Sequence, residues 1–381
     1  MKYKGFNTTC IHAGEIENDP FKGAVSPLFM STSYAYENVE TKRYPRAFNT
    51  PNQEALCKKI AALEHTEAAL LFGSGMGAVS TALLAFLQPG DHVVFQKSLY
   101  GGTFALTANV FTKMGIQFTM TPGVSKADFE NAITDKTKII FIETPSNPLL
   151  TLTDVQMVAD LAKDKGLISM IDNTFATPVN QNPHDLGIDV VIHSATKYMG
   201  GHSDILAGAV CASNELMATI HSYGMNIGAN LSDYTVWLLE RSIKTLGIRV
   251  KAQNENALVL AEYLEQHESI EKVYYPGLKS HQDYELATKQ MRGFGGMMSF
   301  ELKEGLDSVA FVEALEIIKP SMSLAGIEST ILSPAKTSHQ AMPREERLKQ
   351  GISDELLRFS VGIEETEDLI ADLENAFKKI K

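Results

Sequence analysis

The sequence predicts an α/β protein that has a large, mainly parallel sheet and a smaller α+β region at its C-terminal end. Apolar runs alternate with helical stretches over residues 53–193, which is typical of parallel sheets covered by helices. A long helical region at 232–266 follows, and fewer strand patterns come after it. The length of 381 residues exceeds what a single small core accommodates, so two domains are expected.

The expected elements are short strands separated by helices. Residues 53–63 have a helical spacing of Ala, Leu and Ile, and the apolar run 70–72 leads through a glycine-rich loop into a helix at 78–87. Strands are expected at 92–95, 138–142, 167–171 and 190–193, and helices at 106–114 and 153–165. The helical region 232–266 contains no breaker except Gly247, and the best later strands are 297–301 and 357–361.

We place a domain boundary near Ile248, because the strand and helix pattern changes there. The predicted division is an N-terminal arm at 1–48, a first domain at 49–248 and a C-terminal domain at 249–381. The sequence contains no repeat, no low-complexity segment and no long Pro/Gly/Ser linker, so the domains are expected to pack closely.

The charge balance argues against several classes of partner. The chain has 34 basic and 46 acidic residues and a net charge of -12, which disfavours non-specific attraction to nucleic acid or anionic membranes. The N-terminus lacks the apolar core of a signal peptide, and no later run is long and apolar enough to span a bilayer. We therefore expect a cytoplasmic protein without a nucleic-acid or membrane partner.

Cysteines and histidines form no recognisable metal or disulfide pattern. The three cysteines lie far apart and are expected to be packing residues: Cys10, Cys57 and Cys211. Four histidines whose spacings match no zinc pattern are interpreted as packing or pocket residues: His184, His193, His202 and His339. No metal site is expected.

Lys197 follows the expected strand 190–193 directly, within Ser194-Ala195-Thr196-Lys197-Tyr198. Ligands collect at the carboxyl ends of parallel strands, and a lysine partly removed from water there has a lowered pKa. Such an amine is nucleophilic and can form a Schiff base with a carbonyl group. The hydroxyls of Ser194 and Thr196 suit a phosphate beside it. Taken alone, the motif fits an exposed loop lysine equally well.

Three further features are compatible with a phosphorylated aromatic cofactor. Asp172 ends the strand 167–171, where a carboxylate can hold a protonated pyridine nitrogen, although such residues also cap helices. The loop 73–77 has the spacing G-x-G-x-G, which lets backbone amides approach a phosphate but matches the dinucleotide fingerprint poorly. Tyr100, before Gly101 and Gly102, can stack on a flat ring or simply be a core tyrosine.

Taken together, these motifs resemble the Cys/Met-metabolism family of enzymes that depend on pyridoxal 5'-phosphate (PLP). The matching segments are Ser-Gly-Met at 74–76, Tyr-Gly-Gly at 100–102, Glu-Thr-Pro-Ser-Asn-Pro at 143–148, Asp-Asn-Thr at 172–174 and Ser-Ala-Thr-Lys-Tyr at 194–198. The resemblance extends from 11–14 to 358–364. It implies the fold of type I PLP-dependent transferases, which is similar to aspartate aminotransferase, and a homotetramer made of two dimers with shared active sites.

The resemblance also implies roles for individual residues. The first domain binds PLP, and the arm 1–48 reaches the neighbouring subunit. The cofactor contacts are Lys197 by covalent attachment, Asp172 at the ring nitrogen, Tyr100 on the ring, Asn147 near the ring hydroxyl, Gly75, Met76, Ser194 and Thr196 at the phosphate, and Tyr44 and Arg46 at the phosphate from the neighbouring subunit. The substrate contacts are Ser323 and Arg358 at the α-carboxylate and Glu328 at the distal end.

Chemistry supports several of these assignments. The fixed fork of an arginine matches a phosphate or a carboxylate at two points, which suits Arg46 and Arg358. The implied proton-transfer groups, and hence the expected catalytic residues, are Lys197, Tyr100 and Tyr44.

The resemblance favours a lyase that breaks a carbon-sulfur bond, acting on cystathionine by γ- or β-elimination. The runner-up is γ-replacement, as in cystathionine γ-synthases and O-acyl-homoserine sulfhydrylases. Gly102 stands where methionine γ-lyases usually have Cys, and Arg43 stands where vertebrate-type cystathionine γ-lyases have Glu. Other departures are Ala105, which replaces a basic residue, and the segment 49–52, where the family more often has Asn-Pro-Thr. A nucleotide-dependent oxidoreductase and a non-catalytic binding protein are weaker alternatives.

Overall fold

A seven-stranded sheet forms the larger part of the computed structural model, which describes residues 3–16, 19–338, 340 and 343–380. Its strand order is β1-β7-β6-β5-β4-β2-β3, in which β7 runs antiparallel to both neighbours and the other pairs are parallel. The strands are β1 (Ala68–Phe72), β2 (His92–Phe95), β3 (Gln117–Met120), β4 (Thr137–Glu143), β5 (Ile168–Asp172), β6 (Val190–His193) and β7 (Gly208–Ala212). The expected mainly parallel sheet is confirmed.

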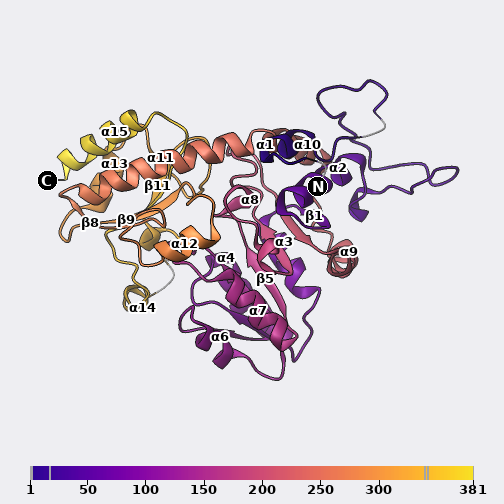
Figure 1. Ribbon diagram of the computed structural model, residues 1–381, viewed down its shortest axis with the longest axis horizontal. Helices are drawn as coiled ribbons and strands as arrows, with labels where there is room; N and C mark the ends of the chain where they lie inside the picture. The colour runs from indigo at the N-terminus through magenta and orange to yellow at the C-terminus, as the bar shows by residue number, and fades with distance from the viewer. Residues whose placement is uncertain (1–2, 17–18, 339, 341–342, 381) are drawn as a thin grey trace.

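Helices cover both faces of this sheet, as Figure 1 shows around β5. One face packs Ile140, Ile142 and Val191 into one core, and the other packs Phe95, Phe141 and Met170 into a second. Because both faces are buried, the central strands are apolar almost throughout rather than alternating. The helices of this region are α2 (Pro51–Glu64), α3 (Gly75–Leu84), α4 (Gly101–Leu106), α5 (Thr112–Met114), α6 (Lys126–Ala132), α7 (Val155–Lys165), α8 (Thr177–Asn180), α9 (Asn214–Ile227) and α10 (Asp233–Ile243).

Two strands of the large sheet were not expected from the sequence. β3 is a partly exposed edge strand with polar residues, and β7 consists mostly of small residues. The predicted helix 106–114 is part of a continuous helical stretch, α4 to α5, whose middle turn at Thr107–Phe111 is π-helical. Elsewhere in this sheet the expected strands agree with the observed ones to within two residues at each end.

A five-stranded mixed sheet follows, with the order β10-β11-β12-β9-β8. Its strands are β8 (Ile270–Tyr274), β9 (Met297–Leu302), β10 (Lys319–Pro320), β11 (Thr330–Leu332) and β12 (Leu356–Ser360), so β9 and β12 correspond to the two strands expected there. The helices of this part are α12 (Tyr284–Gln290), α13 (Ser308–Ala314), α14 (Arg344–Lys349) and α15 (Thr366–Lys379). Phe300, Phe359 and Phe377 lie in its core.

Helix α11 (Leu246–Gln266) joins the two sheets and crosses the upper part of Figure 1. Leu246 and Val250 belong to a core of the large sheet, whereas Leu260 and Leu264 belong to that of the small sheet. The predicted single helical region is wrong, because the chain breaks between α10 and α11, before Gly247. Gly247 instead allows close packing, since a Cβ there would lie 2.0 Å from Oδ1 of Asn7.

The predicted boundary between 248 and 249 falls inside α11, and the division into 49–248 and 249–381 stays a prediction. Helix α1 (Phe6–His12), which contains Asn7, packs against both α11 and α2. The chain end therefore stabilises the junction between the two sheets.

Beyond α1, the described residues of the N-terminal arm are mostly exposed. After α1 it runs as an extended segment that projects away from the body on the right of Figure 1. Trp237 holds one point of it by donating from Nε1 to the carbonyl of Ser26 at 2.9 Å. Just after the arm, Thr50 begins α2 with a capping box. Its hydroxyl accepts from Gln53 N at 3.2 Å, and its own N–H donates to the Gln53 side chain at 3.1 Å.

Candidate active site

Two carboxylates lie side by side where β4 and β5 end. Asp172, the last residue of β5, is directly opposite Glu143, the last residue of β4. The Asp172 carboxylate accepts from the backbone N–H of Thr174 at 3.0 Å. Burial raises the pKa of Asp172, and the hydrogen bonds from Thr174 and a positive charge on His193 oppose that rise. Two buried carboxyls this close favour having a proton on one of them.

Glu143 belongs to a motif noted in the sequence, but no role for it was predicted. Its carboxylate accepts from the backbone N–H of Tyr100 at 2.7 Å, so it fixes the start of α4. Burial is the main cause that raises the pKa of Glu143 well above its ordinary value, and the negative charge of Asp172 adds to it. The signal that could have found it is its place at the end of a buried strand, which Asp172 shares.

Lys197 lies just beyond β6, at the same edge of the sheet as Asp172. The backbone N–H of Ser194 donates to the Thr174 hydroxyl at 2.8 Å, which joins the two strand ends. The Lys197 ammonium donates from Nζ to the hydroxyl of Ser323 at 3.1 Å. Burial lowers the pKa of Lys197, and the positive charge of Arg358 lowers it further. The expected shift toward the neutral amine is therefore confirmed in direction.

The glycine loop closes against the residues that follow β6. Ser74 caps α3 by accepting from the N–H of Gly77 at 2.9 Å. A Cβ on Gly75 would lie 2.7 Å from the Cβ of Ser194, so only glycine permits this approach. The first N–H groups of a helix have no intrahelical acceptor, which leaves those of Gly75 and Met76 for an anion beside Ser194.

Thr196, like Ser194, was predicted to contact the phosphate, but its hydroxyl already has partners within the chain. Its hydroxyl donates to the carbonyl of Ala207 at 3.1 Å and accepts from the N–H of Ala207 at 3.0 Å. A hydroxyl has a single hydrogen, so in this arrangement Thr196 has no further hydrogen to donate to a phosphate. The predicted phosphate contact of Thr196 stays a prediction.

The Tyr100 ring lies beside the glycine loop and is half exposed, 47% of its surface being accessible. A Cβ on Gly102 would lie 2.4 Å from the Tyr100 ring and 3.0 Å from the sulfur of Met76. Tyr100, Gly102 and Met76 are therefore neighbours, and an exposed ring here is available to stack on a ligand rather than filling the core.

The small sheet supplies a buried arginine to the same region. Arg358, on β12, donates from Nη1 to Oδ1 of Asn147 at 3.1 Å and from Nη2 to the carbonyl of Ser323 at 3.4 Å. Burial lowers the pKa of Arg358 to about 10. These contacts join three predicted site residues that are distant in the sequence. Among the described residues, no carboxylate forms a hydrogen bond with this guanidinium, which lies near Lys197.

An outer cavity of about 230 Å³ opens next to Ser323. Its lining includes Thr196, Ser203, Lys319, Ser321, Ser323 and Glu328. Glu328 accepts a hydrogen bond from the hydroxyl of Ser203. Lys319 was missed in the sequence analysis, because an exposed lysine on a two-residue strand carries no local signal. The cavity thus has one acidic and one basic side chain in its wall.

The predicted residues on the arm are not brought to this site within the chain. Arg46 donates from Nη1 to the carbonyl of Met225, at the end of α9, at 2.7 Å, and its guanidinium lies 5.5 Å from the centre of the Tyr44 ring. Arg43 forms an ion pair with Glu54 at 3.0 Å. No hydrogen bond among the described residues joins Tyr44 or Arg46 to Lys197.

The described residues include no cluster of three or more potential metal ligands. His184 bonds to the carbonyl of Ile188 at 3.0 Å, and His202 bonds to that of Gly200 at 2.8 Å, as packing residues do. His339 lies outside the described residues. Within the ranges that the structure covers, no helix is long and apolar enough to cross a membrane.

Comparison with known proteins agrees with this geometry. The family model described as "Cys/Met metabolism PLP-dependent enzyme" matches residues 7–378. The chain belongs to this family. It is 43% identical to a cystathionine gamma-lyase of Bacillus subtilis (strain 168), over 98% of this chain and 99% of the relative. It is also 39% identical to an L-methionine gamma-lyase of Fusobacterium nucleatum subsp. nucleatum, over the whole of both chains.

The crystal structure of a cystathionine gamma-lyase from Lactobacillus plantarum, complexed with L-serine, matches this chain with a TM-score of 0.95. The two chains are 42% identical, and the match covers 99% of each. The predicted fold of PLP-dependent enzymes is therefore confirmed. The enzyme depends on PLP and acts in sulfur amino acid metabolism, while relatives of similar identity catalyse different reactions.

The residues present fit PLP. The close approach of Gly75 to Ser194 forms a cradle with two backbone donors, which suits a phosphate. A lysine whose pKa burial lowers lies at the same sheet edge as Asp172, whose carboxylate can face a ring nitrogen. The half-exposed ring of Tyr100 completes a binding surface for a flat group.

Proposed function

We propose that this enzyme is a carbon-sulfur lyase that acts on cystathionine by γ- or β-elimination, releasing a thiol amino acid, ammonia and a 2-oxo acid. The observation that supports this choice is the outer cavity, whose wall contains both Lys319 and Glu328. Cystathionine ends in a second amino-acid group, which carries an ammonium and a carboxylate. An acidic and a basic side chain match those two charges, whereas the methyl end of methionine has no charge to pair.

The proposed roles follow from where each side chain lies. Arg358 binds the substrate α-carboxylate at two points, since its fork is buried and held by Asn147 and Ser323. Lys197, whose pKa is lowered by burial, removes the α-proton in its neutral form. When bound, PLP withdraws electrons from the substrate α-carbon, which weakens the bonds at that carbon. Tyr100 protonates the leaving sulfur, and the Asp172 carboxylate faces the ring nitrogen.

The remaining site residues are proposed as cofactor contacts. Gly75, Met76 and Ser194 hold the phosphate from within the chain, and Thr196 joins them once its hydroxyl hydrogen turns from the carbonyl of Ala207 to the phosphate. Asn147, which contacts Arg358, lies toward the ring hydroxyl.

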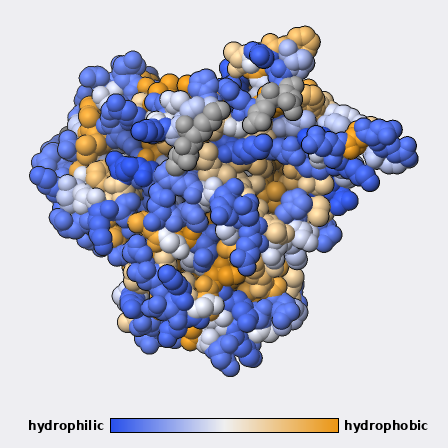
Figure 2. Space-filling view, turned by 45° about the vertical axis from the view of Figure 1, so that its right-hand side comes forward, coloured by the Kyte–Doolittle hydropathy of each residue, from blue (hydrophilic) through white to orange (hydrophobic). Residues whose placement is uncertain are grey.

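We also propose that the enzyme is a homotetramer in which Tyr44 and Arg46 reach the phosphate of a neighbouring subunit. The arm exposes large apolar side chains, such as Phe21 at 90% and Tyr36 at 69%. Figure 2 shows further hydrophobic residues gathered in the middle of one face. Exposed apolar surface of this kind is typical of an interface with another chain. The expected cytoplasmic location stays a prediction.

The test of substrate choice is a steady-state assay of the purified PLP-loaded enzyme with cystathionine and with methionine. We expect cystathionine to be the better substrate, with 2-oxobutyrate showing γ-elimination and pyruvate showing β-elimination. Glu328→Gln and Lys319→Met are each expected to lower kcat/KM for cystathionine about 10-fold, and to change it for methionine less than about 2-fold. Lys303→Met, at an exposed position outside the cavity, is the matched control.

Three results would contradict the proposal. Faster turnover of methionine than of cystathionine would assign the enzyme to the methionine-degrading relatives. Formation of cystathionine from cysteine and an activated homoserine, without release of a 2-oxo acid, would assign it to γ-replacement. Equal losses for both substrates in Glu328→Gln would show that the cavity does not recognise the distal group.

A further inference from the structure

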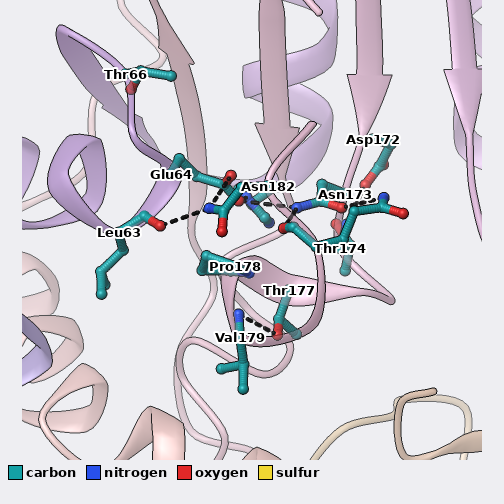
Figure 3. A network of polar contacts seen from close by, with 12 residues as sticks. Leu63, Glu64, Thr66, Asp172, Asn173, Thr174, Thr177, Pro178, Val179 and Asn182 are labelled. Carbon is teal, nitrogen blue, oxygen red and sulfur yellow. Dashed lines mark hydrogen bonds and ion pairs between the residues drawn. The ribbon is translucent and has the colours of Figure 1, made fainter. Parts of the chain in front are cut away.

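A buried carboxylate lies behind the active site, on the side of the sheet that faces α2. Glu64 is the last residue of α2 and has no exposed surface. Figure 3 shows its side chain pointing toward Asn173 and Asn182, in the segment that follows β5. Nε2 of His193 lies 2.5 Å from Glu64 Oε1, and the amide of Asn173 donates to the same oxygen at 3.0 Å. Asn182 donates to Oε2 at 3.4 Å.

Each of these partners adjoins a residue of the active site. Asn173 follows Asp172, and His193 precedes the segment that contains Lys197. The Asn173 N–H also donates to the carbonyl of Ile192 at 2.9 Å, so the two strand ends are joined by main-chain and side-chain bonds. The Glu64 carboxylate therefore connects two chain segments. One presents Asp172 and the other presents Lys197, at opposite ends of the predicted cofactor site.

A structural role alone does not account well for this arrangement. A buried carboxylate loses its hydration, and well-packed apolar residues of similar volume are often at least as stabilising as a buried ion pair. Other contacts already hold α2 on the sheet, among them Ile60 and Leu63, which pack in the core. The polar group adds charge and orientation, which apolar packing cannot supply.

We propose that Glu64 and His193 form a buried pair that positions Asp172 and Lys197 relative to each other and places positive charge next to Asp172. In this pair His193 has protons on both ring nitrogens, and Glu64 accepts one of them. Both are positioning residues, since neither contacts the predicted cofactor site directly. The proposal rests on the PLP dependence of the family and is independent of the substrate proposed above.

The ionisable groups around the Glu64–His193 pair determine how the pair changes the protonation of Asp172. Asp172 lies opposite Glu143 on β4, and after burial the negative charge of Asp172 is the next cause that raises the pKa of Glu143. Cys211, on β7, is the neighbouring ionisable group on the Glu64 side, and burial followed by the Glu64 charge raises its pKa, so it stays a neutral thiol. Burial raises the pKa of Asp172, and a positive His193 counteracts that rise. Without this charge, a larger fraction of Asp172 is protonated and cannot hold a protonated ring nitrogen.

The test compares Glu64→Gln and His193→Gln with His65→Gln, a matched control. His65 adjoins Glu64 in the sequence and forms an exposed pair with Asp185 at 2.7 Å. PLP-loaded enzyme is titrated with acid while the visible absorbance of the cofactor is recorded, and the PLP dissociation constant is measured by dialysis. We expect both buried variants to bind PLP about 10-fold more weakly and to lose the cofactor signal at a higher pH than wild type. The control should not change either value.

Glu64→Asp separates the effect of the charge from simple stabilisation. It keeps the charge, so we expect its absorbance titration to stay close to wild type even where its melting temperature falls. If Glu64→Gln and His193→Gln lower only the melting temperature, with the titration and the PLP dissociation constant unchanged, the pair is structural and the proposal is wrong.

A second measurement needs no variant. In wild-type enzyme labelled with 15N-histidine, the proposal predicts a buried ring with the nitrogen chemical shifts of an imidazolium. Neutral-ring shifts for all buried histidines would overturn it. Loss of cystathionine turnover alone would bear on the proposed substrate and leave this proposal intact.

Discussion

The carboxyl edge of the large sheet and the N-terminal arm present their predicted site residues in opposite ways. Asp172 is 9% exposed and hydrogen-bonded to its neighbours, whereas Tyr44 is 49% exposed and lies on an extended segment. At the sheet edge, packing within one chain holds the side chains before any ligand binds. On the arm, Tyr44 and Arg46 are exposed, and it is the proposed neighbouring subunit that would complete their surroundings. One chain therefore contains the residues of the sheet edge in place, whereas the arm residues are expected to act only after subunits assemble.

The largest expected effect is at the sheet edge, from Lys197→Ala. Loss of the amine should lower the rate of 2-oxo acid release by at least about 100-fold, because it removes the proposed proton-transfer group. The visible absorbance band of the PLP-loaded enzyme should also disappear. Lys138→Ala, at an exposed position on β4, is the control and should retain both. A variant without Lys197 that keeps its band and its rate would refute the assignment.

Mixing two inactive variants tests the arm. If Arg46 acts in the neighbouring subunit, a dimer of Arg46→Ala and Lys197→Ala chains has one site with both lesions and one intact site. Random re-association should therefore restore about a quarter of the wild-type sites, counted as activity after denaturation and refolding of the mixture. Each variant refolded alone is the control. Absence of any recovery in a mixture that forms tetramers would mean that Arg46 acts within its own chain or not at all.

Features of the fold and the site could be predicted where a local sequence pattern marks them, and not where they depend on contacts between distant parts of the chain. The strands 92–95 and 190–193 were predicted because buried parallel strands are apolar over a short stretch, and Lys197 was found because it follows the second of them. The capping box at Thr50 and Gln53 was readable but overlooked, so the predicted start of α2 was two residues late.

The pairing of Glu143 with Asp172 depends on strand register, and the contact of Arg358 with Asn147 spans 211 residues. Neither has a local pattern, so a single sequence does not reveal them.

A smaller effect is expected from Glu143→Gln. The quantity measured is the free energy of unfolding of the PLP-free protein as a function of pH. The pKa of Glu143 is raised above 4.5 in the folded state, so the folded protein binds more protons than the unfolded chain in that window. Stability from this group is thus lost as the pH rises from about 4.5 through the raised pKa. Glu143→Gln does not titrate and should lose less stability over that range in urea unfolding. The exposed Glu130→Gln should follow the wild type.

The smallest expected effect is where the arm joins α2. Thr50→Ala removes the helix cap and the hydrogen bond from the Thr50 hydroxyl to Asp233, and should lower the free energy of unfolding by about 1 kcal/mol. Thr50→Ser, which keeps the hydroxyl, is the control. If Thr50→Ala instead abolished PLP binding, the arm would contribute to the site of its own chain, and the contrast between the two regions would fail.

The outer cavity has a consequence for how such an enzyme can diverge. Lys319, Ser321 and Glu328 lie within a ten-residue stretch that begins on the small sheet, whereas Asp172 ends a strand of the large sheet and Lys197 follows another. Under the proposed role of this cavity, point substitutions at positions 319, 321 and 328 alter which sulfur compound is accepted, whereas Ser323, in the same stretch, contacts Lys197 and belongs to the reaction centre. On such a scaffold, new substrate preferences can evolve, or be engineered, without rebuilding the reaction centre.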